Sequence, residues 1–136
     1  MKISELPAPQ LFVTLAERHG HYCPMSTLGL RLGWAAMKIL NSGIQEATYF
    51  AQTCAGDGIR LVLKFDALQI NEQGQHLLRV IDEDSHWQIE ILPETLELAA
   101  SYRLLDTDSA RDRLLEKLRT ADESRLLKFT DCGEII

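Results

Sequence analysis

Three residues whose side chains bind metals stand at alternate positions near the N-terminus, in the run His19-Gly20-His21-Tyr22-Cys23-Pro24. In an extended segment, residues two apart point to the same side, so this spacing predicts that His19, His21 and Cys23 converge. Imidazole nitrogen and thiolate sulfur are ligands that zinc prefers, about four of them in a tetrahedral shell. The alternative is that two loop histidines and a packed cysteine are neighbours only in the sequence, because free cysteine is often buried.

Cys23 also stands directly before Pro24, and proline is favoured at the first position of a helix. Cys23 would then cap that helix, where unpaired N–H groups and the helix dipole favour the thiolate. With Cys54 and Cys132, the cysteines are odd in number and irregular in spacing, unlike a disulfide framework. We therefore expect cysteines that are buried, reactive or bound to a metal.

These residues resemble the signature of a known family. His19-Gly20-His21-Tyr22-Cys23-Pro24, followed by Gly29-Leu30-Arg31, is similar to the H-G-H-x-C-P-G and G-x-R segments of the formylmethanofuran dehydrogenase E-subunit family. Further along the chain, Cys54-Ala55-Gly56-Asp57-Gly58-Ile59 is similar to the C-x-x-D-x-I segment of that family. The resemblance implies an α+β core domain that forms a homodimer and binds a divalent metal, commonly zinc.

Carried over position by position, the resemblance implies four metal ligands: His19, His21, Cys23 and Cys54. It also implies that Asp57 supports a ligand or acts as an acid or base, which makes Cys23 and Asp57 candidate catalytic residues. Arg31 is a candidate for binding an anionic cofactor or substrate, because its planar guanidinium can pair with a carboxylate. An ordinary surface arginine is the alternative for this position.

The sequence departs from the family pattern in three places. Met25 stands where the family usually has glycine, and its side chain would fill space beside the metal. The stretch from Arg60 to Ile70 lacks the Thr- and Gly-rich loop with a lysine that often follows the second motif. Many members append a zinc finger that begins C-x-x-C-G-E, but the matching segment here holds only Cys132, so we expect no such finger.

Hydrophobic periodicity predicts the elements that position these residues. We expect five helices, over residues 9–20, 24–40, 55–63, 93–105 and from 108 onward. We expect a β-prone run leading into Cys54, an antiparallel hairpin around a polar loop, and a strand or extended arm in the tail, over residues 47–53, 75–92 and 124–136. Gly29 and Gly33, one helical turn apart, indicate close approach by a neighbouring backbone or a second protomer.

This order of elements, helices before and after a group of strands, predicts the α+β class. No linker or repeat divides the sequence, so we expect one domain over residues 1–136. In it, N-terminal helices pack on a small, mainly antiparallel sheet together with C-terminal helices. His76 and His86 flank the predicted hairpin, where we expect them to be solvated or hydrogen-bonded rather than functional.

Composition limits the partners of the protein. The 136 residues are 46% hydrophobic and 25% charged, which is typical of a globular chain and excludes disorder. Fourteen basic and 20 acidic residues give a net charge of −6, so we expect no nucleic-acid partner. No apolar run approaches the ~20 residues of a membrane helix, and the first ten residues lack the apolar core of a signal peptide. We therefore expect a cytoplasmic protein without a membrane partner.

The leading interpretation is a protein that holds a divalent metal, with zinc the first choice, through Cys23, Cys54 and one or both of His19 and His21. Three protein ligands and a water would let the metal act on a small-molecule substrate, whereas four protein ligands would make the site closed and structural. Such a metal would polarise a carbonyl or activate water if a coordination position stays open. One alternative is a thiol-redox protein in which Cys23 pairs with Cys54. Another is a non-catalytic dimeric accessory module in which Gly29 and Gly33 let helices of two protomers pack closely.

Overall fold

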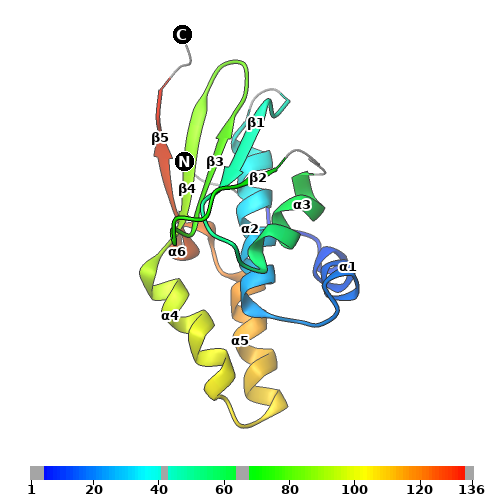
Figure 1. Ribbon diagram of the computed structural model, residues 1–136. Helices are drawn as coiled ribbons and strands as arrows, with labels where there is room; N and C mark the ends of the chain where they lie inside the picture. The colour runs from blue at the N-terminus through cyan, green and yellow to red at the C-terminus, as the bar shows by residue number, and fades with distance from the viewer. Residues whose placement is uncertain (1–4, 41–42, 64–67, 134–136) are drawn as a thin grey trace.

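A five-stranded sheet with a long helix behind it organises the computed structural model, which describes residues 5–40, 43–63 and 68–133 (Figure 1). The strand order is β2-β1-β3-β4-β5, with β1 and β2 parallel and every other neighbouring pair antiparallel. The strands are β1 Glu46–Tyr49, β2 Gln69–Ile70, β3 Leu77–Ile81, β4 His86–Ile91 and β5 Leu127–Asp131. The expected α+β class and mainly antiparallel sheet are confirmed.

Six α-helices and one short 3-10 helix are described. They are α1 Pro9–His19, α2 Pro24–Ile39, α3 Ala55–Leu63, α4 Pro93–Ser101, η1 Tyr102–Leu104, α5 Asp108–Thr120 and α6 Glu123–Leu126. Three of the helices begin with proline, whose missing N–H costs nothing at that position. Figure 1 shows α2 running behind the sheet, with α1 and α3 to one side and α4 and α5 extending below.

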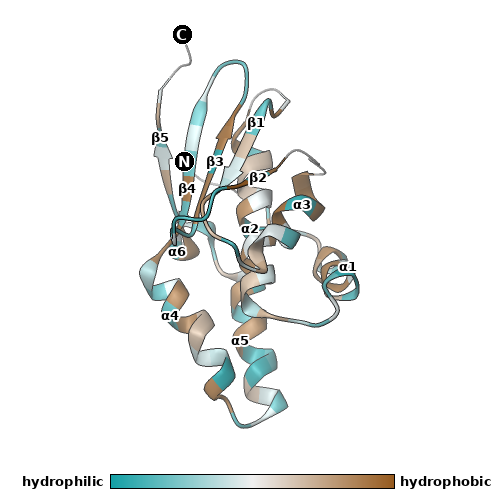
Figure 2. Ribbon diagram, in the orientation of Figure 1, coloured by the Kyte–Doolittle hydropathy of each residue, from teal (hydrophilic) through white to brown (hydrophobic). Residues whose placement is uncertain are grey.

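The main core lies where α2 covers the sheet. Buried side chains of α2 such as Leu28 and Leu32 share one cluster with Leu78, Val80 and Ile89 of the central strands. A smaller cluster holds α1 against α2 and α3, and consists of Phe12, Leu15, Leu30, Trp34 and Val62. The hydropathy colouring of Figure 2 follows this pattern, with apolar residues along α1, at the end of α3 and in β3. Helix α1 therefore joins the fold through α2 and α3.

Glycines let α2 and α3 touch backbone to backbone. A Cβ on Gly29 would overlap the carbonyl group of Ala55, and a Cβ on Gly58 would overlap the main chain of Ser26 and Leu30. A Cβ on Gly33 would stand 3.2 Å from the carbonyl oxygen of Ile59. The close neighbour that the glycines of α2 predict is therefore α3 of the same chain.

The segment before α3 differs from the expected strand over 47–53. Strand β1 ends at Tyr49, because the residues up to Thr53 turn to begin the helix. The hydroxyl of Thr53 accepts a hydrogen bond from the amide of Ala55 at 3.2 Å, and its carbonyl accepts one from Gly56 at 3.2 Å. Thr53 thus belongs to the turn that leads into α3, so Cys54 follows a turn rather than a strand end.

The other elements follow the expectations with small changes. The hairpin of β3 and β4 and the strand in the tail are confirmed, and α4 passes into η1 before residue 105. The short elements β2 and α6 were not expected. The predicted end of the long helix falls partly on residues 41–42, which lie outside the described residues. The last part of the tail, residues 134–136, also lies outside them. Within the described part of the chain, every helix is too short or too polar to cross a bilayer.

Candidate metal centre

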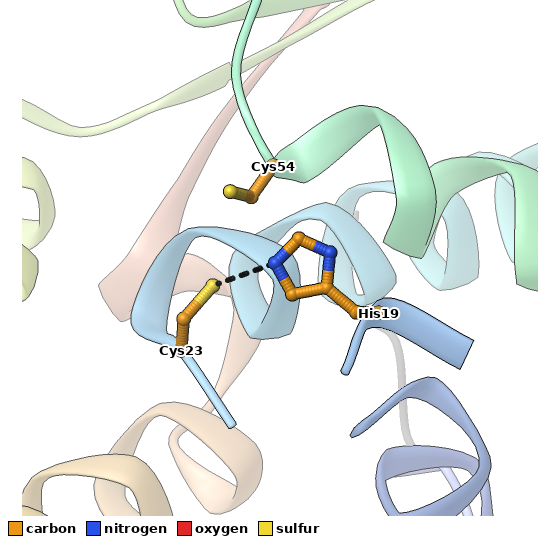
Figure 3. Close-up of side chains that lie close together, drawn as sticks. All are labelled: His19, Cys23 and Cys54. Atoms are coloured by element: carbon orange, nitrogen blue, oxygen red, sulfur yellow. Dashed lines mark hydrogen bonds between the residues drawn. The ribbon is translucent and has the colours of Figure 1, made fainter. Parts of the chain in front are cut away.

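Three side chains from three segments meet beside the first turn of α2 (Figure 3). His19 is the last residue of α1, Cys23 precedes α2, and Cys54 precedes α3. Their ligand atoms all lie within 4.8 Å of one another, and each residue is half-buried. Nε2 of His19 lies 3.6 Å from Sγ of Cys23. The fold therefore brings together three of the four predicted metal ligands.

Cys23 caps α2, as its position before Pro24 predicts. The amide of Ser26 donates a hydrogen bond to Sγ of Cys23 at 3.3 Å, and Oγ of Ser26 lies 3.1 Å from the same sulfur. The carbonyl of Cys23 accepts a hydrogen bond from the hydroxyl of Thr27 at 2.9 Å. The first turn of α2 therefore holds the sulfur of Cys23 in place beside His19.

Asp57 fixes the orientation of His19. Its Oδ2 lies 2.6 Å from Nδ1 of His19, across 38 residues of sequence, and it comes from the first turn of α3. When Nδ1 donates its proton to this carboxylate, the lone pair of Nε2 stays free and faces the sulfur of Cys23. A carboxylate behind a metal-binding histidine is a common arrangement, because it sets the tautomer and strengthens the ligand.

The thiol of Cys54 is harder to ionise than an ordinary cysteine. Burial raises the pKa of the Cys54 thiol above its usual value, and the nearby sulfur of Cys23 raises it further. Two sulfurs this close repel each other once both are ionised. A divalent cation between them would reverse that effect, because it stabilises both thiolates.

His21 lies outside the group of three. The residue is exposed, and its ring centroid stands 4.5 Å from that of His19. The premise of an extended segment is wrong here, because α1 runs through His19 and Gly20 has a positive φ of 96°. His21 instead lines the pocket beside this group of three. Its role as a fourth ligand stays a prediction.

Arg31 lies inside the fold, fully buried. Its guanidinium donates hydrogen bonds to the carbonyls of Leu118, Arg119 and Ala121, at the C-terminal end of α5. It also pairs with the buried carboxylate of Glu123 at 2.9 Å. The carboxylate that Arg31 binds in the structure is therefore internal, and the contacts join α2 to α5 and α6. Binding of an external anion by Arg31 stays a prediction.

A pocket of about 460 Å³ opens beside the two sulfurs. Its lining includes Cys23, Cys54, Met25 and His76. The expectation that His76 is hydrogen-bonded holds, but its partner is the buried hydroxyl of Tyr49, 3.4 Å from Nδ1. The alternation of residues in the predicted strand does not indicate that His76 lies near Cys54, because the two residues come together only when β3 pairs with β1. Met25 stands in the wall beside Cys23, where its side chain was expected to fill space.

The donor set fits a divalent metal. Two sulfurs and one imidazole nitrogen suit zinc better than hard ions such as magnesium or calcium, which prefer oxygen. Three protein ligands leave one place of a tetrahedral shell for water or a substrate. The pocket lies next to the group, so a molecule in it would be within reach of that place.

Comparison with known proteins identifies the fold and the family. No curated protein matches the chain. The crystal structure of an FmdE-like protein from Syntrophus aciditrophicus, described as of the tungsten formylmethanofuran dehydrogenase type, matches with a TM-score of 0.65 and 19% identity, over 91% of this chain and 71% of that one. This likeness shows a shared fold. Residues 18–129, which include all the residues of the metal-binding group, match the family described as "FmdE, Molybdenum formylmethanofuran dehydrogenase operon", and the chain therefore belongs to the FmdE family.

Proposed function

We propose that this protein binds a divalent metal ion, with zinc as the first candidate, through His19, Cys23 and Cys54. We also propose that the site acts on a small molecule held in the adjoining pocket. The observation that carries the proposal is the convergence of the three ligand atoms within 4.8 Å. Two ionised cysteines from distant parts of the sequence would repel each other at this separation. A bound cation accounts for the arrangement, because it offsets the repulsion and the burial of both sulfurs.

A bound zinc ion would supply Lewis-acid chemistry, by polarising a carbonyl or lowering the pKa of a water molecule. The residues of the chain have separate tasks around it. Asp57 holds Nδ1 of His19 and keeps its Nε2 available as a ligand. The first turn of α2 holds the sulfur of Cys23, and the pocket offers a small molecule a place beside both sulfurs.

Elemental analysis of protein purified without added metal tests the proposal. We expect about one equivalent of zinc per chain in the wild type, as for a single protein site, and loss of that metal in Cys23→Ser and in Cys54→Ser. Cys132→Ser is the matched control, because Cys132 is exposed and lies in the tail outside the group. Retention of a full equivalent by both site variants would falsify the proposal.

His21 decides whether the shell is open or closed. A fourth ligand from His21 would make the site closed and structural, whereas three ligands and a water allow chemistry. We propose the open form, because His21 lies outside the group of three in the structure. In cobalt-substituted protein, the d–d absorption of His21→Ala should match that of the wild type. A change in band position and intensity would mean that His21 coordinates the metal and that the shell is closed.

A thiol-redox function is the second candidate, because the ligand atoms of Cys23 and Cys54 lie within 4.8 Å. Formation of a disulfide would need a shorter separation of the two sulfurs, and it would compete with metal binding. Thiol counting after mild oxidation separates the two functions. A metal protein keeps both thiols shielded until a chelator is added, whereas a redox protein loses two thiols reversibly and holds no metal.

The homodimer that the family resemblance implies is part of the same proposal, as is a cytoplasmic location, which suits three unpaired cysteines. Sedimentation analysis should give the mass of two chains. The glycine argument for a dimeric accessory module no longer applies, because Gly29 and Gly33 face α3 of the same chain.

A further inference from the structure

The pocket beside the metal-binding group has an apolar wall and a cationic rim. Met25 of α2 and Leu96 and Ala99 of α4 form part of the wall, and Arg103 of η1 joins the lining. Its volume of about 460 Å³ lies within the range of sites that enclose small organic molecules. The combination of apolar surface with a few polar groups is typical of such sites.

Charge in this pocket has the opposite sign to the protein as a whole. The chain carries a net charge of −6, yet none of the described residues that line the pocket is acidic. Arg103 is exposed, and no ion pair or hydrogen bond joins its guanidinium to another residue in the described part of the chain. Other arginines of this protein, such as Arg31 and Arg111, are paired with carboxylates. Arg103 is therefore free to pair with an anion in the pocket.

A metal in the neighbouring group would not cancel this charge. Two thiolates carry two negative charges, which balance those of a divalent cation, and neutral His19 adds none. With the metal bound, Arg103 remains the fixed charge among the residues that line the pocket. A negative ligand is therefore favoured over a neutral or positive one of the same shape.

We propose that this pocket binds a small organic anion with an apolar body. The charged group pairs with Arg103, and the body lies against Met25, Leu96 and Ala99. The inference deepens the proposed function, on which it rests, because it names the class of molecule that the metal would act on. It predicts selection by charge at one end of the ligand and by apolar contact along its length.

NMR titration of the full chain, with zinc bound and with carbon-13 in the methionine methyl groups, tests the inference. The Met25 methyl lies in the pocket wall and serves as the reporter, and Met25→Leu assigns its signal. Phenylacetate, phenylacetamide and 2-phenylethylammonium share one apolar body and differ in charge. We expect phenylacetate to shift the Met25 signal saturably and to bind about tenfold more tightly than the amide, as one charged hydrogen bond provides. The ammonium ion should bind most weakly.

Two arginine variants identify the anion partner. Arg103→Gln should weaken phenylacetate about tenfold and leave phenylacetamide unchanged, because only the charged hydrogen bond is lost. Arg113→Gln removes the same charge from an exposed position of α5 that does not line this pocket, and it should leave both affinities unchanged. Equal affinities for the acid and the amide, no saturable shift at millimolar concentration, or identical effects of the two variants would each overturn the inference.

The titration also separates this inference from the metal proposal. A chelator removes zinc, and elemental analysis reports its loss independently of ligand binding. Phenylacetate binding that needs zinc but not Arg103 would mean that the carboxylate coordinates the metal alone, which would overturn the inference and leave the metal proposal standing. If the protein never holds zinc, the metal proposal is wrong. The comparison of Arg103→Gln with Arg113→Gln would still show whether the pocket binds an anion.

Discussion

The backbone of Gly29 lies directly against the carbonyl group of Ala55, with no room for a side chain between them. Ala55 follows Cys54, and Gly29 belongs to the helix that Cys23 caps. Helices α2 and α3 therefore meet near the ends that Cys23 and Cys54 precede. This contact between two main chains sets the separation of Cys23 and Cys54 more rigidly than side-chain packing alone would.

Replacement of Gly29 by alanine should disrupt that contact. We expect Gly29→Ala to lower the free energy of unfolding by about 3 kcal/mol or more, because the added Cβ meets backbone that must shift. Gly33→Ala should cost less, since its Cβ would stand 3.2 Å from the nearest atoms. Gly43→Ala is the control, because nothing lies within 4 Å of its Cβ. Urea denaturation measures all three, and equal stability of Gly29→Ala and Gly43→Ala would contradict the prediction.

The hydrogen bond between Asp57 and His19 should control metal affinity. Asp57→Asn removes the negative charge behind the imidazole, so we expect zinc to bind about 10- to 100-fold more weakly. Competition with a chromophoric chelator gives the affinity. Because Asp57 is half exposed, the fold should tolerate the change. Asp112→Asn, on the exposed surface of α5, should bind zinc as the wild type does, and a matching loss there would refute a specific role for Asp57.

Breaking the buried ion pair of Arg31 and Glu123 should lower the stability of the fold strongly. Glu123→Gln leaves the guanidinium without its counter-ion, and we expect a loss of about 3 to 5 kcal/mol in the free energy of unfolding. Arg31→Lys keeps the charge but should also destabilise the fold, because an ammonium group cannot reach three carbonyls and a carboxylate with the same geometry. Arg113→Lys is the exposed control. Urea midpoints within error of the control would show that the pair is dispensable.

Tyr49 should make the fold sensitive to alkaline pH. Burial raises the pKa of its hydroxyl above 10.0, whereas in the unfolded chain it ionises near the ordinary value. The stability that comes from keeping the phenol neutral is therefore complete below about pH 10 and is lost as the pH rises toward the folded value. Urea denaturation at about pH 9 and pH 11 should show a larger loss for the wild type than for Tyr49→Phe. Equal losses would mean that another group causes the alkaline transition.

Much of the site was readable from local sequence. Pro24 fixes the start of α2, which makes Cys23 its cap, and the two motif segments supply His19, Cys54 and Asp57. The error concerns local geometry: the alternate spacing of His19 and His21 indicates an extended segment, but the helical periodicity of α1 continues to His19. Gly20 then turns the chain with a positive φ, and that turn brings His19 back toward Cys23.

The residues that sequence analysis placed less well depend on contacts across long stretches of chain. His76 reaches the pocket through the pairing of β1 with β3, and Arg31 finds partners 87 to 92 residues away. A periodic pattern describes which face of a helix or strand is buried, but it does not say which distant backbone covers that face. Arg31 therefore resembles an ordinary surface arginine until the end of α5 is in place.

The internal position of Arg31 has a consequence for how the chain is made. During synthesis, α2 leaves the ribosome long before the carbonyls of Leu118 to Ala121 and the carboxylate of Glu123 exist. Burying a guanidinium without partners is costly, so we expect the side of α2 that carries Arg31 to stay in water until the end of α5 has emerged. We therefore expect a fragment that ends before residue 118 to be much less stable than the full chain, because it lacks every partner of this guanidinium.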